Sequence, residues 1–280
     1  EENKFQIKTY LTSLYQHQVS EIGKSRKLAF DTLWGISQKG LVFTAKDALN
    51  CHLVDKLVYE DELMSIIKRK SSTYQFTNLS KYLESDDNYK YAEEKIAIIY
   101  AEGDIMPGKS ENNSQIASET FIKTLKEVSN DKSIKAIVVR VNSPGGSSMA
   151  SDIIAKEIKL AKKIKPVIFS YGNVAASGGY YISCVGDSIF ALPNTVTGSI
   201  GVFAMVANTE NLFGQKLGLK YETVNVGEMA EIWRPDRGMD AAQSMMMQNA
   251  VNNIYDDFIS IVSEGRHIEK SVVKIGRAHV

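Results

Sequence analysis

Ser177 stands in a run of small residues and is followed by two glycines, Gly178 and Gly179, so its hydroxyl has little side-chain cover. A second loop upstream contains another glycine pair, Gly145 and Gly146, whose backbone N–H groups are equally uncovered. A serine hydroxyl can attack a carbonyl carbon, and exposed N–H groups can hold the oxyanion that forms. The two loops together therefore predict acyl-transfer chemistry.

Structural roles are possible for the same residues. Ser177 could simply cap a helix, with Gly178 and Gly179 serving as a tight packing site. A third small-residue loop surrounds Ser199, which could hydrogen-bond within the site or could only shape a turn. The residues themselves leave both alternatives open.

A nucleophilic serine needs a general base, and the sequence offers no obvious one. No histidine lies between Ser177 and Glu264, and the four in the chain read as surface or packing residues: His17, His52, His267 and His279. A lysine can also serve, because burial lowers its pKa toward neutrality. From Tyr221 to Glu269, however, there is no lysine at all.

The composition is that of an ordinary soluble globular protein. The chain has 280 residues, 44% of them hydrophobic and 24% charged, with a formal net charge of zero. This length suits one large domain or two modest ones, and the charge balance gives no reason to expect nucleic acid as a partner. Cys51 and Cys184 form neither a disulfide framework nor a metal-ligand spacing, and we expect both to be buried thiols.

No apolar run reaches the roughly 18 residues that cross a bilayer, and no signal peptide opens the sequence. The first residue is Glu1 rather than Met, and no polar tail precedes Val280. We expect both ends to continue into a longer polypeptide, which could carry a membrane anchor.

Hydrophobic periodicity predicts helices over residues 4–28, within 30–57 and over 61–70, with Thr44 capping a short one. The polar stretch 71–93 is typical of a linker. Strands then alternate with helices: we predict strands over 96–101, 134–141, 167–171, 187–192 and 221–226, and helices over 118–129, 148–163, 177–184 and 240–265. This alternation predicts an α/β fold with a largely parallel sheet, whose carboxyl ends carry the ligand-binding loops.

Three motifs together resemble the signal peptide peptidase A family, also called protease IV, in its long two-repeat form. They are Asn142-Ser143-Pro144-Gly145-Gly146-Ser147, Ala175-Ala176-Ser177-Gly178-Gly179-Tyr180 and Thr197-Gly198-Ser199-Ile200-Gly201. The resemblance implies a crotonase- or Clp-protease-like fold of repeated ββα units. It also implies that Ser177 is the nucleophile, that Gly145, Gly146 and Gly178 form the oxyanion hole, and that Ser199 orients a general-base lysine.

The chain departs from the family pattern at that lysine. In the short form the lysine follows the serine, but residues 227–230 contain none. In the long form it comes from the first repeat, and residues 40–57 resemble the end of a repeat. We therefore expect residues 1–70 to end the first repeat, 71–93 to be a linker and 94–280 to be most of the second. The base is then a lysine upstream of Glu1.

The resemblance implies a serine endopeptidase with a Ser/Lys dyad that cleaves signal peptides or other short apolar peptides. It implies no cofactor and no metal, a homo-oligomer, expected to be a tetramer, and a membrane contact through a segment outside this chain. The catalytic part would face the extracytoplasmic, periplasmic side. Two alternatives remain open: a crotonase-like acyl-CoA enzyme and a non-catalytic scaffold with the same fold.

Overall fold

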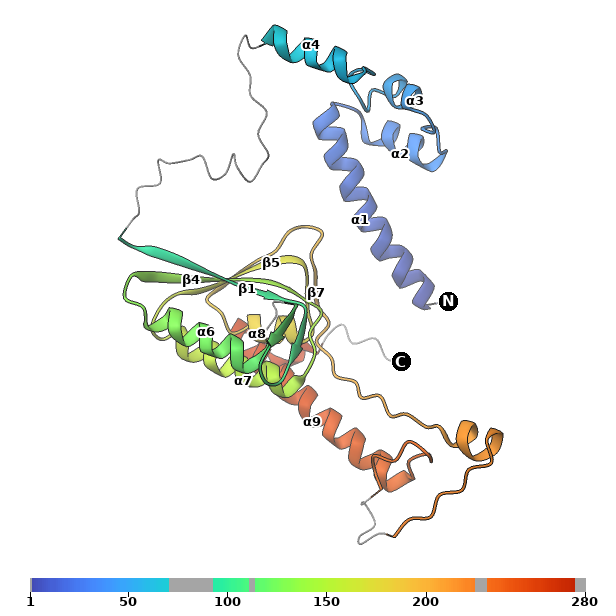
Figure 1. The fold of residues 1–280 in the computed structure, drawn as a ribbon, viewed down its shortest axis with the longest axis vertical. Helices are drawn as coiled ribbons and strands as arrows, with labels where there is room; N and C mark the ends of the chain where they lie inside the picture. Colours follow the sequence, from blue (N-terminus) through green and yellow to red (C-terminus); the bar gives the residue numbers. More distant parts are fainter. Residues whose placement is uncertain (1, 71–92, 111–113, 225–230, 275–280) are drawn as a thin grey trace. The chain divides into compact units, whose positions relative to one another are not determined.

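The computed structural model describes residues 2–70, 93–110, 114–224 and 231–274. The chain divides into two compact units, residues 1–92 and residues 93–280 (Figure 1). The linker predicted over 71–93 lies almost wholly outside the described residues. Each unit is therefore considered by itself.

The first unit is helical, with α1 (Glu2–Arg26), α2 (Phe30–Gln38), α3 (Ala45–Asn50) and α4 (Glu60–Lys70). The helix predicted within 30–57 is α2, and the short helix predicted after Thr44 is α3. Between them, Thr44 and Asp47 form a capping box, which confirms the predicted cap: the Thr44 hydroxyl accepts from the Asp47 N–H at 3.2 Å. Trp34 packs against Tyr15 and Phe30 at ring-centroid distances of 5.5 and 5.6 Å, which joins α1 to α2.

The second unit is built on a five-stranded, wholly parallel sheet of order β1-β4-β5-β6, with β7 pairing the far end of β5. The strands are β1 (Lys95–Glu102), β4 (Ile134–Ser143), β5 (Val167–Ala176), β6 (Ser188–Phe190) and β7 (Val196–Gly198). Two short parallel strands, β2 (Asp104–Met106) and β3 (Gln115–Ala117), form a separate ribbon that the sequence did not predict. The parallel α/β architecture confirms the predicted fold class.

Helices α6 (Ser118–Asn130), α7 (Ser148–Ala161) and α8 (Gly178–Ser183) lie on one face of the sheet (Figure 1). Alternate residues of the central strands point into this layer, so Val139 of β4 and Phe169 of β5 are fully buried. The carboxyl-terminal part of α9 (Ala241–Arg266) packs against α8, where the Tyr181 and Phe258 rings are 4.8 Å apart. The short helix α10 (Lys270–Val273) follows.

Strand β5 runs five residues beyond its predicted end at Tyr171, and this extension brings it to Ser177. Between the pairs Val141–Tyr171 and Ser143–Ala175 the two strands fall out of register, so β5 is bulged there. The Asn142 side chain stabilises the bulge by accepting from the Val174 N–H at 3.2 Å.

The strand predicted over 221–226 is wrong for its described part. Residues 221–224 have no regular structure and are exposed, and 225–226 lie outside the described residues. A β-prone sequence needs a neighbouring strand to satisfy its backbone, and none lies beside these four residues in the part of the chain that the structure describes. A π-helix, η1 (Asn211–Lys216), precedes them.

Candidate active site

Ser177 occupies the sharp turn between β5 and α8. Its backbone angles are φ +50° and ψ −121°, a conformation that non-glycine residues rarely adopt. Its N–H donates to the Gly198 carbonyl of β7 at 2.9 Å, and its carbonyl accepts from the Tyr181 N–H at 2.8 Å, which starts α8. Although Ser177 stands at the N-cap position, its side chain makes no capping hydrogen bond. The simple capping role is therefore not realised.

The glycine loop after β4 is held against this turn through β2. The Ile105 N–H donates to the Gly145 carbonyl, and the Ile105 carbonyl accepts from the Ser147 N–H, both at 2.8 Å. These two bonds form a bridge that does not use the N–H of Gly146. Gly146 lies between the two bonded residues, and its N–H thus stays available to a ligand.

Gly145 is the point at which the two loops touch. A Cβ atom there would lie 2.6 Å from the Gly178 nitrogen and 2.8 Å from the Ser177 Cβ, and the φ of Gly145 is +106°. Only glycine combines this backbone conformation with such a close approach. The N–H of Gly145 donates to the Ser143 hydroxyl at 3.1 Å, so the predicted oxyanion donor is engaged inside its own loop.

A pocket of about 390 Å³ elsewhere in this unit is larger, but the pocket over Ser177, of about 250 Å³, brings the predicted chemistry together. Ser177, Gly146 and Gly178 share its wall. Gly178 is the first residue of α8, so its N–H has no partner within the helix. Ser177 and these two glycines thus line one small cavity, which is the arrangement of residues that acyl transfer requires.

The remaining wall is mainly apolar, and Gly201 is the one residue in it that belongs to a predicted site motif. Its residues are Ser148 and Ser151 of α7, Tyr181 of α8, Gly201, Val202 and Phe203 after β7, and Ile254 and Phe258 of α9. The helix predicted over 240–265 does contain Ile254 and Phe258. Nothing in the local sequence indicated that this helix meets the serine pocket, because the contact joins segments far apart in the chain.

Tyr181 closes one side of the pocket. Its hydroxyl donates to the Asp152 carboxylate at 2.8 Å. Burial and the bond to Asp152 both raise the pKa of Tyr181, so the phenol stays protonated near neutrality. Its neighbour Cys184 is fully buried in the core, which raises the pKa of that thiol to about 12. Cys51, by contrast, is half-buried, so the expectation of two buried thiols is confirmed only for Cys184.

Ser199 follows β7 directly. Because Ala176 and Gly198 are register partners, Ser177 and Ser199 leave adjacent strand ends, and both have positive φ. Ser199 is exposed and is not part of the pocket wall, which begins two residues later at Gly201. None of the described residues that line the pocket is a lysine or a histidine.

Comparison with known proteins places these features in a family. Residues 159–279 match the profile described as Peptidase family S49, and residues 88–198 match that described as Clp protease. Ser177 falls in the stretch that both profiles cover. The Clp protease match agrees with the parallel sheet and its covering helices.

Curated proteins extend the match to nearly the whole chain. Protease 4 of Haemophilus influenzae is 31% identical over 97% of this chain and 46% of its own length. Serine protease SPPA of Arabidopsis thaliana is 29% identical over 92% of this chain and 40% of its own. A protein of Enterococcus faecium that carries the name of a signal peptide peptidase is 37% identical over 58% of this chain and 47% of its own length. The chain is thus similar to peptidase family S49 over residues 159–279 and to proteins named as proteases over most of its length.

The chain spans about half the length of the curated relatives it matches; it covers 46% of Protease 4, for example. Among residues 2–70, 93–110, 114–224 and 231–274, none of the helices combines the length and the apolar character that a membrane crossing needs.

Proposed function

We propose that this chain carries the nucleophile of a serine peptidase and that Ser177 is that nucleophile. The proposal rests on the position of Ser177 at a strained strand-to-helix turn, where its hydroxyl makes no capping hydrogen bond. Ser177 also lines one cavity with Gly146 and Gly178. Such a turn presents a nucleophile at the carboxyl edge of a parallel sheet. The match to the family S49 profile favours this function over an acyl-CoA enzyme or a scaffold.

In the proposed reaction, the Ser177 Oγ forms a bond to the substrate carbonyl carbon, and its proton passes to the general base. The carbonyl oxygen becomes an oxyanion that accepts from the N–H groups of Gly178 and Gly146. The C–N bond then breaks, the amine leaves with the proton, and water releases the acyl group. Gly145 has no side chain, which lets its loop approach the Ser177 turn closely. Its N–H can donate to the oxyanion only after its hydrogen bond to the Ser143 hydroxyl breaks.

The general base remains a predicted lysine upstream of Glu1, with Ser199 as the residue that orients it. Two features support this assignment: the described pocket wall contains no lysine or histidine, and Ser199 emerges beside Ser177. Adding upstream sequence should then raise the rate at which a peptide ester is hydrolysed. Full turnover by the 280-residue chain alone would contradict this assignment of the base.

The size and apolar wall of the pocket fit a small or medium apolar side chain next to the scissile bond. Signal peptides and other short apolar peptides are therefore the proposed substrates, in keeping with the names of the relatives. We further propose that residues 1–70 end a first repeat and 94–280 form most of a second. A tetramer, anchored to the membrane outside this chain and facing the periplasmic side, completes the proposal.

Labelling with a fluorophosphonate probe tests the nucleophile. In a protein that includes the upstream sequence, and with it the proposed base, peptide mass mapping should place the label on Ser177, and Ser177→Ala should abolish labelling. Ser148→Ala is the matched control, because Ser148 lines the same pocket but follows no strained turn. Unchanged labelling of a folded Ser177→Ala protein would reject Ser177 as the nucleophile.

A further inference from the structure

Strand β1 is an edge of the main sheet and has free hydrogen-bonding groups along its outer side. The Gly103 N–H donates inward to the Asn142 carbonyl of β4 at 3.0 Å. N–H and C=O directions alternate along a strand, so every second residue before Gly103 faces away from β4. These residues are Ile96, Ile98, Tyr100 and Glu102, and among the described residues no strand pairs with them.

This edge has few of the features that protect sheet edges from pairing, since Glu102 is the one charged residue among those that face away from β4. It is eight residues long and has no proline or bulged residue facing outward. Ile98 and Tyr100 are exposed by 58% and 66%. A long apolar edge of this kind is a template for another extended chain.

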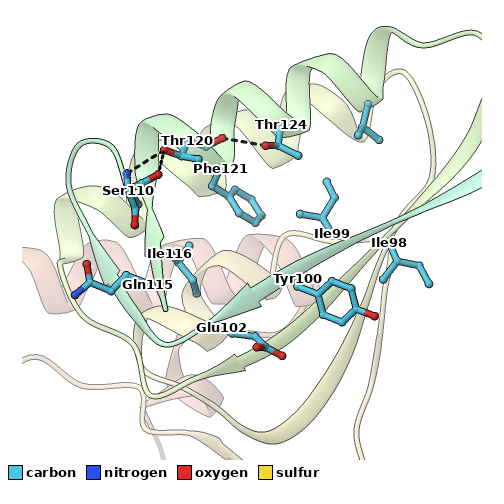
Figure 2. A pocket seen from close by; sticks show the side chains of 12 residues that line it. Ile98, Ile99, Tyr100, Glu102, Ser110, Gln115, Ile116, Thr120, Phe121 and Thr124 are labelled. Carbon is cyan, nitrogen blue, oxygen red and sulfur yellow. Dashed lines mark hydrogen bonds between the residues drawn. The ribbon is translucent and has the colours of Figure 1, made fainter. Parts of the chain in front are cut away.

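A pocket of about 390 Å³ opens directly beside the edge, between β1, β3 and α6 (Figure 2). Its floor is formed by Ile99, Ile116 and Phe121, whose side chains lie around a common space (Figure 2). Hydroxyl and amide groups surround it, from Ser110, Gln115, Thr120 and Thr124. An edge that binds backbone, next to a cavity that takes side chains, is the arrangement by which proteins add a peptide as an extra strand.

The charge of the groove indicates which peptide would fit. Glu102 is the one charged residue lining it, and none of the ion pairs found among the described residues involves Glu102. The groove therefore complements an apolar segment with a positive charge at the end that reaches Glu102. The pocket shares no lining residue with the pocket over Ser177.

We propose that β1 is a peptide-holding site, at which an extended apolar segment with a basic residue at one end binds as an additional strand. This inference rests on the proposed peptidase function, because signal peptides combine an apolar run with a basic region. Alternate side chains of the bound segment would enter the pocket over Phe121 while the basic group meets Glu102. The site would retain a substrate separately from the cleavage pocket.

The first test measures peptide binding to the full chain carrying Ser177→Ala, so that no cleavage occurs. The probes are fluorescent ten-residue leucine–alanine peptides with a lysine at either end, and the same peptides with a glutamate there. We expect one lysine peptide to bind about fivefold more tightly than its glutamate partner, and Glu102→Lys to reverse this preference. Glu127→Lys, the same charge change on α6 outside the pocket, should leave the preference unchanged.

A second variant tests the backbone pairing. Tyr100→Pro removes one outward N–H and no bond to β4, so the sheet should persist while peptide affinity falls about tenfold. Tyr100→Phe keeps the N–H and should bind like the parent. Photo-crosslinking peptides should attach to β1 or α6 and not to the pocket over Ser177.

Three outcomes would overturn the site. Glu102→Lys and Tyr100→Pro could bind like Glu127→Lys, or crosslinks could map only to the Ser177 pocket. Tyr100→Pro could instead dissociate an oligomer in sedimentation, which would show that a second copy occupies the edge. Fluorophosphonate labelling separates this proposal from the proposed function: labelled Ser177 with no dependence on Glu102 rejects the edge site alone. Binding that depends on Glu102, in a protein that includes the upstream sequence and whose Ser177 is never labelled, rejects the peptidase alone.

Discussion

Residues 2–70 and the sheet-bearing unit both contain helices that hydrophobic spacing predicts. The two units differ in how many apolar side chains they bury. Among residues 2–70 only Val19 and Leu33 are buried apolar side chains, and Phe43 is 96% exposed. In the second, strands and helices from distant parts of the chain enclose one continuous core that includes Phe169. The comparison shows that a helix needs only local signals, whereas a precisely placed side chain needs long-range packing.

The largest difference between the units should appear on truncating matched phenylalanines. Phe169→Ala leaves a cavity in a fully buried site and should lower the free energy of unfolding of the second unit by about 3–5 kcal/mol. Phe43→Ala should change stability by less than about 0.5 kcal/mol. Urea unfolding followed by hydrogen exchange of peptides from each unit measures both. Equal effects would contradict the contrast in packing.

Two helical glycines sharpen the same comparison. Helix propensity alone predicts that alanine stabilises either position by about 1 kcal/mol. Gly35 of α2 has open space around it, so Gly35→Ala should show that gain. A Cβ at Gly265 of α9 would lie 2.3 Å from the Cys184 carbonyl oxygen, so Gly265→Ala should cost about 2 kcal/mol instead. Thermal unfolding measures both, and a gain at Gly265 would show that α9 is free to move away from α8.

The smallest expected difference between the two units is in how Cys184 and Cys51 affect the pH dependence of the free energy of unfolding. Burial raises the pKa of Cys184 from 9.0 to about 12, so the folded state keeps a proton that the unfolded state loses. Its stabilising contribution is complete below about pH 9 and is lost as the pH rises toward 12. Between about pH 8 and about pH 10.5, the free energy of unfolding should fall by about 1–2 kcal/mol more in the parent chain than in Cys184→Ala.

Cys51→Ala is the matched control: it removes the other thiol of the chain and leaves Cys184 in place, so it should retain the steeper fall of the parent chain. Iodoacetamide should likewise modify Cys51 in the folded protein and Cys184 only after unfolding. Tyr181 contributes to the pH dependence in the same direction, since its pKa is also raised. A free energy of unfolding that does not change with pH across this range would contradict the burial of the Cys184 thiol and the Tyr181 phenol.

Local signals predicted most elements of the second unit to within a few residues. Strand β4 and helices α6 and α9 follow from apolar periodicity, and Asp240 and Gln243 form a capping box at the start of α9. The failures have a common cause. The extension of β5, the short β7 and the β2–β3 ribbon exist because a partner strand is present, and residues 221–224 are irregular because none is.

The sequence by itself determined the chemical groups: a serine between small residues, two glycine pairs, and no lysine from Tyr221 to Glu269. It also determined their place after parallel strands, because residue type and period act locally. Only the tertiary structure decided that Gly145 touches the Ser177 turn and that Ile254 and Phe258 close the pocket. It also decided that β1 is an edge beside which no strand lies among the described residues. These contacts join segments far apart in the chain, and their geometry depends on how the whole core packs.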